Sequence, residues 1–390
     1  MTPNLSGAQW RDFCVQALGA NSPSELDGSG RPCDDGSLFG YAAEQGVTVQ
    51  VYQALREVHE VHNAPSAATG LRNGLREEAY RQVSQCAIQA RQLAPVLEAL
   101  SAAGIRPLLF KGVPLAYSHY SRPYLRPRCD TDMMVRYGDL SSIRTVLISL
   151  GFQSQPGVTG DLISHQQIFI RRDASGYANV IDLHWKISNP RIFSGLIDYE
   201  ELLEHSVPVP QLGLNAFAAD SVHALLIACI HRVAHHHNSR RLIWLYDIFL
   251  LANSMSDADV HRFGSLAIDK GVIAVCRDGL DASFAQFGMN EVAEYSDAWR
   301  SVHRSWTTQP IEATTVFLRN RSRIAEFYDE VSALPDWRAQ LRLVGQHLWP
   351  NAEYMRSRYP MSSSRWLPYF YAKRVLSGLG KWLGRSRRVD

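Results

Sequence analysis

The chain has 390 residues, of which 46% are hydrophobic and 20% are charged, so it can bury a large core and is not of the disordered class. Its formal net charge of +2 gives no general attraction to nucleic acid, so any anion-binding site must be local. The six cysteines are scattered and form no C-x-x-C pair, which argues against a zinc ribbon, a redox motif or a disulfide framework.

The first residues, MTPNLSGAQWRDF, lack the basic-then-apolar order of a signal peptide. The longest apolar runs, near Val222–Ile230 and Leu242–Ala252, are too short to span a bilayer and are interrupted by His223 and Asp247. We therefore expect a cytoplasmic protein with reduced cysteines.

The N-terminal part of the chain, residues 1–103, is expected to be helical. Residues 8–60 have apolar side chains at three- and four-residue spacing, interrupted by the loop-like stretch NSPSELDGSGRPCDDGS. A long helical pattern then runs from Leu71 to Ala103, and Gly104 supplies its stop.

The pattern changes to short apolar and β-branched runs after Gly104. IRPLLF, DTDMMV, QQIFIRR and NVIDLHWKI predict strands, and GDLSSIRTVLISLGF predicts a helix that ends at Gly151. Residues 104–205 are therefore expected to form a small catalytic core with a mixed sheet, and residues 206–390 to form a larger helical domain. The predicted fold class is α+β.

Two carboxylates stand at alternate positions of one predicted strand, and a third lies in another. Asp130 and Asp132 are expected to project from the same face about 7 Å apart, and Asp182 shares a face with His184 by the same parity. Buried carboxylates repel one another, so their convergence needs a cation. Oxygen ligands of this kind suit Mg²⁺ or Mn²⁺.

Basic residues flank these acids. Lys111 and Gly112 stand where a strand ends and a helix begins, a place where backbone amides and a lysine can receive a phosphate. Arg126 and Arg128 precede the acidic pair and could hold the rest of a triphosphate. Acids for metal and cations for phosphate together indicate a nucleotide site.

The order of these motifs resembles the DNA polymerase β-type nucleotidyltransferase superfamily. More narrowly, it is similar to a bacterial family of uncharacterised nucleotidyltransferases. The resemblance covers about residues 80–360 and is carried by LLFKGVPLAY, LRPRCDTDMMV, VIDLHWKI, HRVAHHHNSRRLIWLYDIFLLA and, more loosely, HLWPNAEYMRSRYP.

The resemblance implies a role for each matched residue. Asp130, Asp132 and Asp182 match the superfamily's catalytic and metal-binding carboxylates. Lys111 and Gly112 replace its Gly-Ser turn, with Val113 where the serine would stand, and Arg126 matches the narrower family's arginine. With His184 as a residue that orients Asp182, these side chains would bind ATP or another nucleoside triphosphate.

A histidine-rich segment adds a second candidate site. His231 and His235 share a helix face by their i, i+4 spacing and could bind zinc with Asp247 as a third ligand. The favoured interpretation is that they line the cleft and hydrogen-bond Asp247, Tyr246 or a substrate phosphate. His236, His237, Arg240 and Arg241 are expected in a solvated loop or an acceptor-facing rim.

The implied reaction is Mg²⁺-dependent transfer of a nucleotidyl group to an unknown hydroxyl on a small molecule, peptide or protein. The modest net charge argues against a long nucleic acid. The basic, aromatic segment RWLPYFYAKRVLSGLGKWLGRSRRVD could contact a membrane, although docking on the protein body is favoured. A metal-dependent phosphohydrolase, a nucleotidyltransferase toxin and a non-catalytic protein of the same fold are the alternatives.

Overall fold

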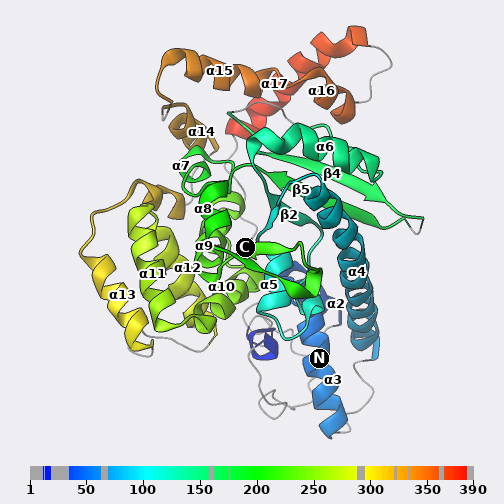
Figure 1. Ribbon diagram of the computed structural model, residues 1–390, viewed down its shortest axis with the longest axis vertical. Coiled ribbons are helices and arrows are strands. Elements are labelled where there is room, and N and C mark those ends of the chain that lie inside the picture. Colours follow the sequence, from blue (N-terminus) through cyan, green and yellow to red (C-terminus); the bar gives the residue numbers. More distant parts are fainter. Residues whose placement is uncertain are drawn as a thin grey trace.

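The structure is a computed structural model in which the following residues are described: 12, 14–18, 35–62, 69–157, 162–174, 176–287, 295–319, 323–332, 334–359 and 364–383. Residues 12 and 14–18, at the start of the predicted helical stretch, are helical, and most of the predicted loop at 21–37 lies outside the described residues. Figure 1 shows a sheet near the middle of the molecule with helices around it.

The helices α2 (Asp35–Gln45), α3 (Thr48–His62) and α4 (Thr69–Ala102) precede the sheet. The predicted long helix is confirmed as α4, and Gly104 after it has a positive φ of 73° that suits glycine. The C-terminal half of α4 packs on the sheet, where Leu93, Val96 and Leu97 belong to one hydrophobic cluster with sheet residues.

Within the described residues, seven strands form one mixed sheet in the order β3-β4-β5-β2-β1-β7-β6. Their bounds are β1 (Leu108–Leu109), β2 (Thr131–Met134), β3 (Gln153–Ser154), β4 (Gln166–Arg172), β5 (Ala178–His184), β6 (Ser206–Pro208) and β7 (Phe217–Ala219). The four predicted strands are confirmed as β1, β2, β4 and β5. Together with the surrounding helices the sheet fits the expected α+β class.

The parallel pairing of β2 with β5 positions the acids. Asp132 is opposite Asp182, and Met134 is opposite His184. Because side chains alternate along a strand, Met133 and Leu183 point to the other face, where they are fully buried with residues of α4 and α6 (Leu140–Ser149). Each such burial stabilises the fold by roughly 1.5–3 kcal/mol, which fixes the register and so the face on which the acids lie.

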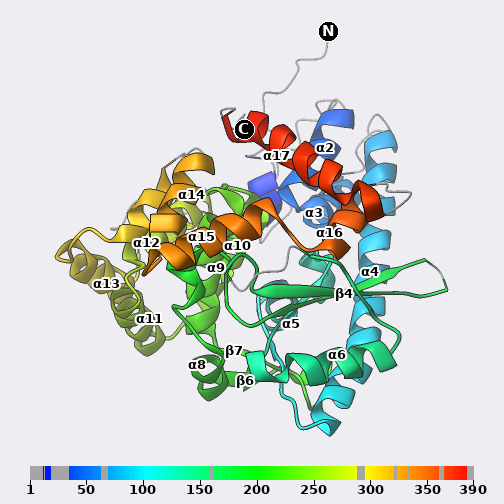
Figure 2. The same ribbon diagram turned by 90° about the horizontal axis from the view of Figure 1, so that it is seen from above.

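The acid-bearing face of the sheet is turned toward the helical region that follows it. Met134, Leu108 and Phe110 pack in one cluster with side chains of α9 (Ser221–His236) and later helices. Asp220 caps α9 by accepting a hydrogen bond from the amide of His223, so the helix starts directly after β7. Figure 2 shows α9 and α10 (Leu242–Ser254) beside the sheet.

The remaining helices extend this region. They are α5 (Gly112–Ser118), α7 (Arg191–Ser194), α8 (Tyr199–Glu204), α11 (Asp257–Asp269), α12 (Ile273–Gln286), α13 (Asp297–Thr307), α14 (Arg323–Ser332), α15 (Trp337–Leu348), α16 (Ala352–Arg358) and α17 (Leu367–Leu383). Short 3₁₀ helices are η3 (Pro123–Leu125), η4 (Tyr137–Asp139), η5 (Pro210–Leu212), η7 (Ala313–Leu318) and η8 (Ser364–Trp366). Among the described helices, none combines the length and the apolar character needed to cross a membrane.

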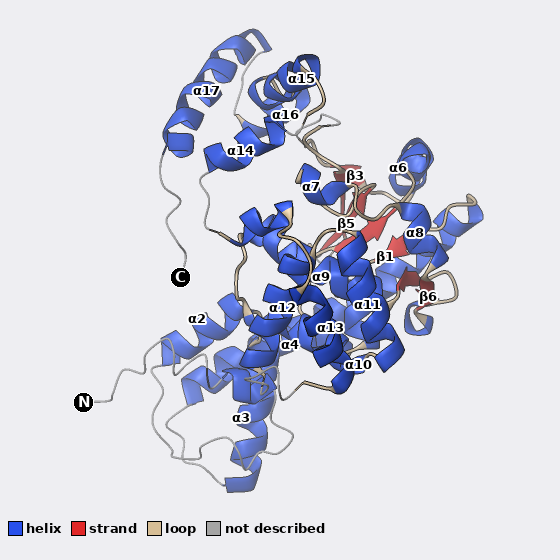
Figure 3. Cartoon of the chain, turned by 90° about the vertical axis from the view of Figure 1, so that its left-hand side faces the viewer, coloured by secondary structure: helices blue, strands red, loops and turns tan. Residues whose placement is uncertain are grey.

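The C-terminal helices α14 to α17 lie together at one end of the molecule (Figures 1 and 3). On α17, Phe370 stacks on Tyr359 and the hydroxyl of Tyr371 donates to the carbonyl of Pro350, so one side of the helix packs on the α16 region. Trp366 and Tyr369 are about half exposed. The basic residues from 384 onward lie outside the described part of the chain.

The sheet continues beyond residue 205, where the sequence suggests a domain boundary. β6 and β7 pair with each other, and β7 adds to β1 in parallel, so the sheet extends to Ala219. The division of the chain into three regions stays a prediction.

Candidate active site

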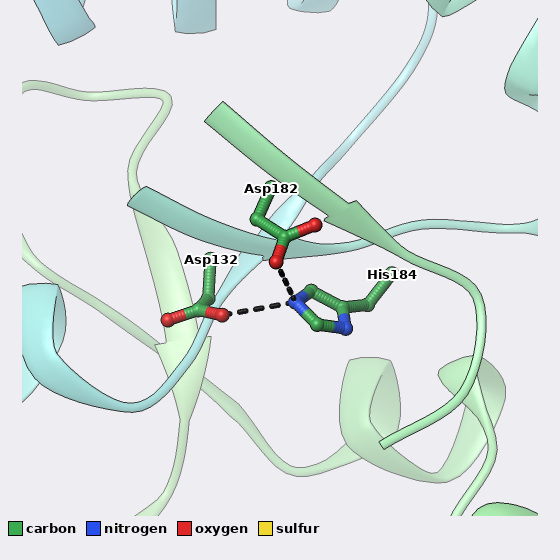
Figure 4. Close-up of side chains that lie close together, drawn as sticks. All are labelled: Asp132, Asp182 and His184. Carbon is green, nitrogen blue, oxygen red and sulfur yellow. Dashed lines mark hydrogen bonds and ion pairs between the residues drawn. The ribbon is translucent and has the colours of Figure 1, made fainter. Parts of the chain in front are cut away.

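A cavity of about 560 Å³ lies between the acid-bearing strands, α5, α9 and α10. Nine of the ten residues singled out in the sequence line it: Lys111, Gly112, Arg126, Asp130, Asp132, Asp182, His231, His235 and Asp247. The tenth, His184, is buried beneath Asp132 and Asp182 (Figure 4). Segments more than 130 residues apart in the sequence therefore meet at one place.

Asp132, Asp182 and His184 form a compact buried cluster. The Nε2 atom of His184 lies 2.9 Å from Oδ1 of Asp132 and 3.3 Å from Oδ2 of Asp182, between the two carboxylates (Figure 4). One ligand atom from each residue lies within 4.8 Å of the others, so the cluster could bind a metal ion. The side-chain amide of Gln166 donates to Asp182 Oδ2 at 3.1 Å, whereas Asp182 Oδ1 is buried without a hydrogen-bond partner among the described residues.

Asp130 lies just before β2 and not within it, since that strand begins at Thr131. Asp130 therefore stands one residue outside the strand that was predicted to carry both aspartates, and both residues line the cavity. Burial and the neighbouring Asp132 raise the pKa of Asp130 to about 6. The pKa of Asp132 is lowered, because Lys111 and His184 outweigh the opposing effect of burial.

Lys111 joins the end of β1 to the start of α5 in an uncommon conformation. Its φ of 60° and ψ of −131° are disfavoured for a residue with a side chain. Its Nζ atom lies 2.7 Å from Asp132 Oδ1, and both side chains are largely buried. Strain of this kind persists only where surrounding structure holds it in place, and it is concentrated at functional sites.

Gly112 opens α5 beside the guanidinium group of Arg126. A Cβ atom at this position would lie 3.7 Å from Arg126 Cζ, which is an ordinary van der Waals distance. The helix fold therefore does not require glycine here. The missing side chain leaves the first turn of α5 open to the cavity, where a ligand can approach the backbone.

Arg126 is held by Asp247 of α10. Its Nε and Nη2 atoms donate to the carboxylate of Asp247, whose Oδ1 also accepts from the hydroxyl of Tyr120 at 2.7 Å. Asp247 therefore lines the cavity with His231 and His235, as expected, but its hydrogen bonds go to Arg126 and Tyr120 and not to these histidines. Arg126 and Tyr120 occupy both oxygens of that carboxylate.

Arg128 also lines the cavity, but its hydrogen bonds are mainly structural. Its Nη1 atom donates to the carbonyls of Pro123 and Arg126, and Nη2 contacts Cys86 Sγ at 3.1 Å. These bonds hold the turn that leads into β2.

The histidines of α9 have other partners than expected. His235 Nε2 is 3.1 Å from Ser188 Oγ, and His231 Nε2 is 3.1 Å from His236 Nε2. Tyr246, the other expected partner, donates to the carbonyl of Leu18. Burial and the charge of Lys111 lower the pKa of His231, and those of His235 and His236 fall to about 4, with burial the largest cause. These imidazoles are neutral at physiological pH.

Several cavity residues were missed or misplaced by sequence reasoning. His236 and Arg241, expected in a solvated loop or rim, line the cavity together with Trp244, on which His236 stacks at 3.8 Å between ring centroids. His237 and Arg240 are exposed, as a rim requires. Gln166 begins a predicted strand, and Trp244 lies in a segment that carries the family resemblance, so both could have been considered. Ser188, the partner of His235, had no such signal.

The donor set fits a hard divalent cation, since the carboxylates of Asp130, Asp132 and Asp182 line one cavity. The buried Asp182 Oδ1 atom supports this fit, because an unpartnered buried carboxylate oxygen is costly unless something binds it.

The sequence matches the family model described as "Uncharacterised nucleotidyltransferase" over residues 32–281, well over half of the chain. The match includes the whole sheet, α9, α10 and every residue of the candidate site. A comparison with curated proteins found no match.

Proposed function

Because the chain belongs to this family of uncharacterised nucleotidyltransferases, we propose that it transfers a nucleotidyl group from a nucleoside triphosphate to a hydroxyl, with release of pyrophosphate. The observation that carries the proposal is the pairing of Asp132 with Asp182 on adjacent strands, beside Lys111 at the start of a helix. This combination of paired acids and a phosphate-binding helix start is also what supports a core of the polymerase β type.

Asp130, Asp132 and Asp182 would hold Mg²⁺ or Mn²⁺. The bound ion would neutralise charge on the reacting phosphate and lower the pKa of the acceptor hydroxyl. Gln166 fixes the orientation of Asp182 through its hydrogen bond, so that Oδ1 of that residue is directed away from Gln166 and free for a ligand or a proton.

Lys111, the backbone at Gly112 and Arg126 would bind the β- and γ-phosphates. Lys111 Nζ now contacts Asp132, and a triphosphate nearby would share or replace that contact. Arg126 is anchored by Asp247 and acts as a fixed positive charge next to Gly112. These cations stabilise the pyrophosphate as it leaves, because negative charge grows on it during the reaction.

The acceptor supplies the attacking oxygen. Its hydroxyl proton passes to Asp182 Oδ1, a bond forms between the oxygen and the α-phosphorus, and the bond from that phosphorus to the pyrophosphate breaks. The neutral imidazoles of His231 and His235 line the same cavity and offer hydrogen bonds to the acceptor or to phosphate oxygens.

The test is a thermal-stability screen of the purified protein with each nucleoside triphosphate and with Mg²⁺ or Mn²⁺. We expect a rise in Tm that requires both metal and one triphosphate and that is lost in Asp132→Asn. Asp269→Asn, which changes an exposed carboxylate on α11, is the matched control and should keep the shift.

Pyrophosphate release with added acceptors would follow as the assay of catalysis. Absence of any nucleotide-dependent shift in the unmodified protein would overturn the proposal in favour of a non-catalytic protein of this fold. Release of inorganic phosphate without an acceptor would instead identify a phosphohydrolase.

A further inference from the structure

The His184 side chain is buried and has one ring nitrogen near two carboxylates. It is 3% exposed, and its Nε2 atom points between the carboxylates of Asp132 and Asp182 (Figure 4). The other nitrogen, Nδ1, points away from both. The strand register enforces this arrangement, because His184 follows Asp182 by two residues on β5 while Asp132 lies directly opposite Asp182 on β2.

The separations are those of neighbouring ligands on one metal ion. Two atoms about 2.1 Å from a shared ion in octahedral coordination are about 3.0 Å apart. The observed distances from His184 Nε2 are 2.9 Å to Asp132 Oδ1 and 3.3 Å to Asp182 Oδ2. The first is also the length of a hydrogen bond, so the distances admit both a supporting and a coordinating role.

Asp182 keeps one oxygen for a bound ion. Its Oδ2 atom accepts from Gln166 and lies near His184 Nε2, whereas its Oδ1 atom is buried without a partner among the described residues. Lys111 Nζ and His184 Nε2 both contact Oδ1 of Asp132. An ion bound by the three residues would use Asp182 as well as Asp132.

We propose that His184 is a direct nitrogen ligand of a divalent transition-metal ion held with Asp132 and Asp182, and that it makes the site prefer such an ion to Mg²⁺. This proposal depends on the proposed function in one respect: both place the metal ion on Asp132 and Asp182. Imidazole nitrogen suits first-row transition metals, whereas Mg²⁺ is bound by oxygen. Coordination requires the tautomer of His184 with its proton on Nδ1, and it replaces the hydrogen bond to Asp132.

Mn²⁺ serves as the probe, with no nucleotide present. Electron spin echo measurements on the unmodified full-length protein with Mn²⁺ should show modulation from a directly bound ¹⁴N nucleus. His184→Gln should lose the modulation and weaken Mn²⁺ binding by about 10-fold or more, with a smaller effect on Mg²⁺ competition. His261→Gln, which changes an exposed histidine on α11, should alter neither.

Mn²⁺ bound without ¹⁴N modulation in the unmodified protein would overturn the proposal, whether or not His184→Gln folds. Loss of the modulation in His231→Gln or His235→Gln, with retention in His184→Gln, would place the nitrogen ligand on α9 and would also overturn it. Because no nucleotide is used, a protein without transfer activity can still pass this test, so the two proposals fail separately.

Discussion

Arg126 and Asp247 are 121 residues apart in the chain, yet three hydrogen bonds of 2.7 to 3.0 Å join the guanidinium of one to the carboxylate of the other. Both side chains are largely buried. The pair connects the turn before β2 to helix α10, so it fixes one wall of the cavity relative to the acids.

Asp247→Asn should lower the free energy of unfolding by about 3 kcal/mol, because it leaves the buried Arg126 cation without its counter-charge. Tyr120→Phe is the matched control; it removes one hydrogen bond to the same carboxylate and should cost about 1 kcal/mol. Urea unfolding measures both. Equal effects of the two variants would contradict a dominant ion pair, and Arg126→Met/Asp247→Leu should recover much of the loss.

Replacing Lys111 tests its backbone strain and its charge separately. Lys111→Met and Lys111→Gly both remove the ammonium group and should both abolish stabilisation by triphosphate. In ligand-free urea unfolding, Lys111→Gly should be the more stable of the two by about 1 kcal/mol, because glycine adopts a φ of 60° without strain. A Lys111→Met protein as stable as Lys111→Gly would show that the strain is absent.

Asp130→Asn should stabilise the metal-free protein in a pH-dependent way. The folded state holds the Asp130 proton up to a pKa of about 6, compared with an ordinary value of 3.8, so ionisation disfavours folding increasingly as pH rises through this window. Asparagine cannot ionise, so the variant should gain on the order of 2 kcal/mol at pH 7–8 and nothing below pH 4. Unfolding curves across this range test the prediction, with Asp269→Asn, a change of an exposed carboxylate, as the control.

Gly112→Ala should affect nucleotide binding without lowering the stability of the fold. The added Cβ meets Arg126 at an ordinary contact distance and favours helix, so stability should stay the same or rise by up to about 1 kcal/mol. The nucleotide-dependent rise in Tm should disappear, because the methyl group occupies the open first turn of α5. Gly138→Ala, where a Cβ meets nothing within 4 Å, should retain it. Nucleotide binding by Gly112→Ala would exclude the proposed phosphate position.

Local patterns were enough to predict most of the central sheet. Gln166–Arg172 matches its predicted strand residue for residue, and the acid strands are rich in apolar residues on their buried face. β3, β6 and β7 were missed because each has only two or three residues, and β6 ends at a proline. The parallel pairing of β7 with β1 joins segments more than 100 residues apart, which no local periodicity records.

The acidic residues of the candidate site could be predicted from the sequence, but most of their hydrogen-bond partners could not. Lys111, Asp132 and Asp182 stand out because charged residues at the ends or within apolar strands are rare. The partners of Asp247 could not be inferred, since Arg126 and Tyr120 reach it only when α10 lies beside the segment that follows α5. His236 was expected in a loop, but α9 continues through it and ends where His237 adopts a left-handed φ of 49°.

The parallel register of β2 and β5 has a consequence for how the protein folds and unfolds. Asp132 meets Asp182 only after the intervening α6, β3 and β4 have returned the chain to the side of β2. No short fragment contains the complete cluster, so a cation that prefers it binds the finished sheet and not the early chain. We expect such a non-local contact to form after the rate-limiting step of folding, in which case the cation should slow unfolding and leave the folding rate nearly unchanged.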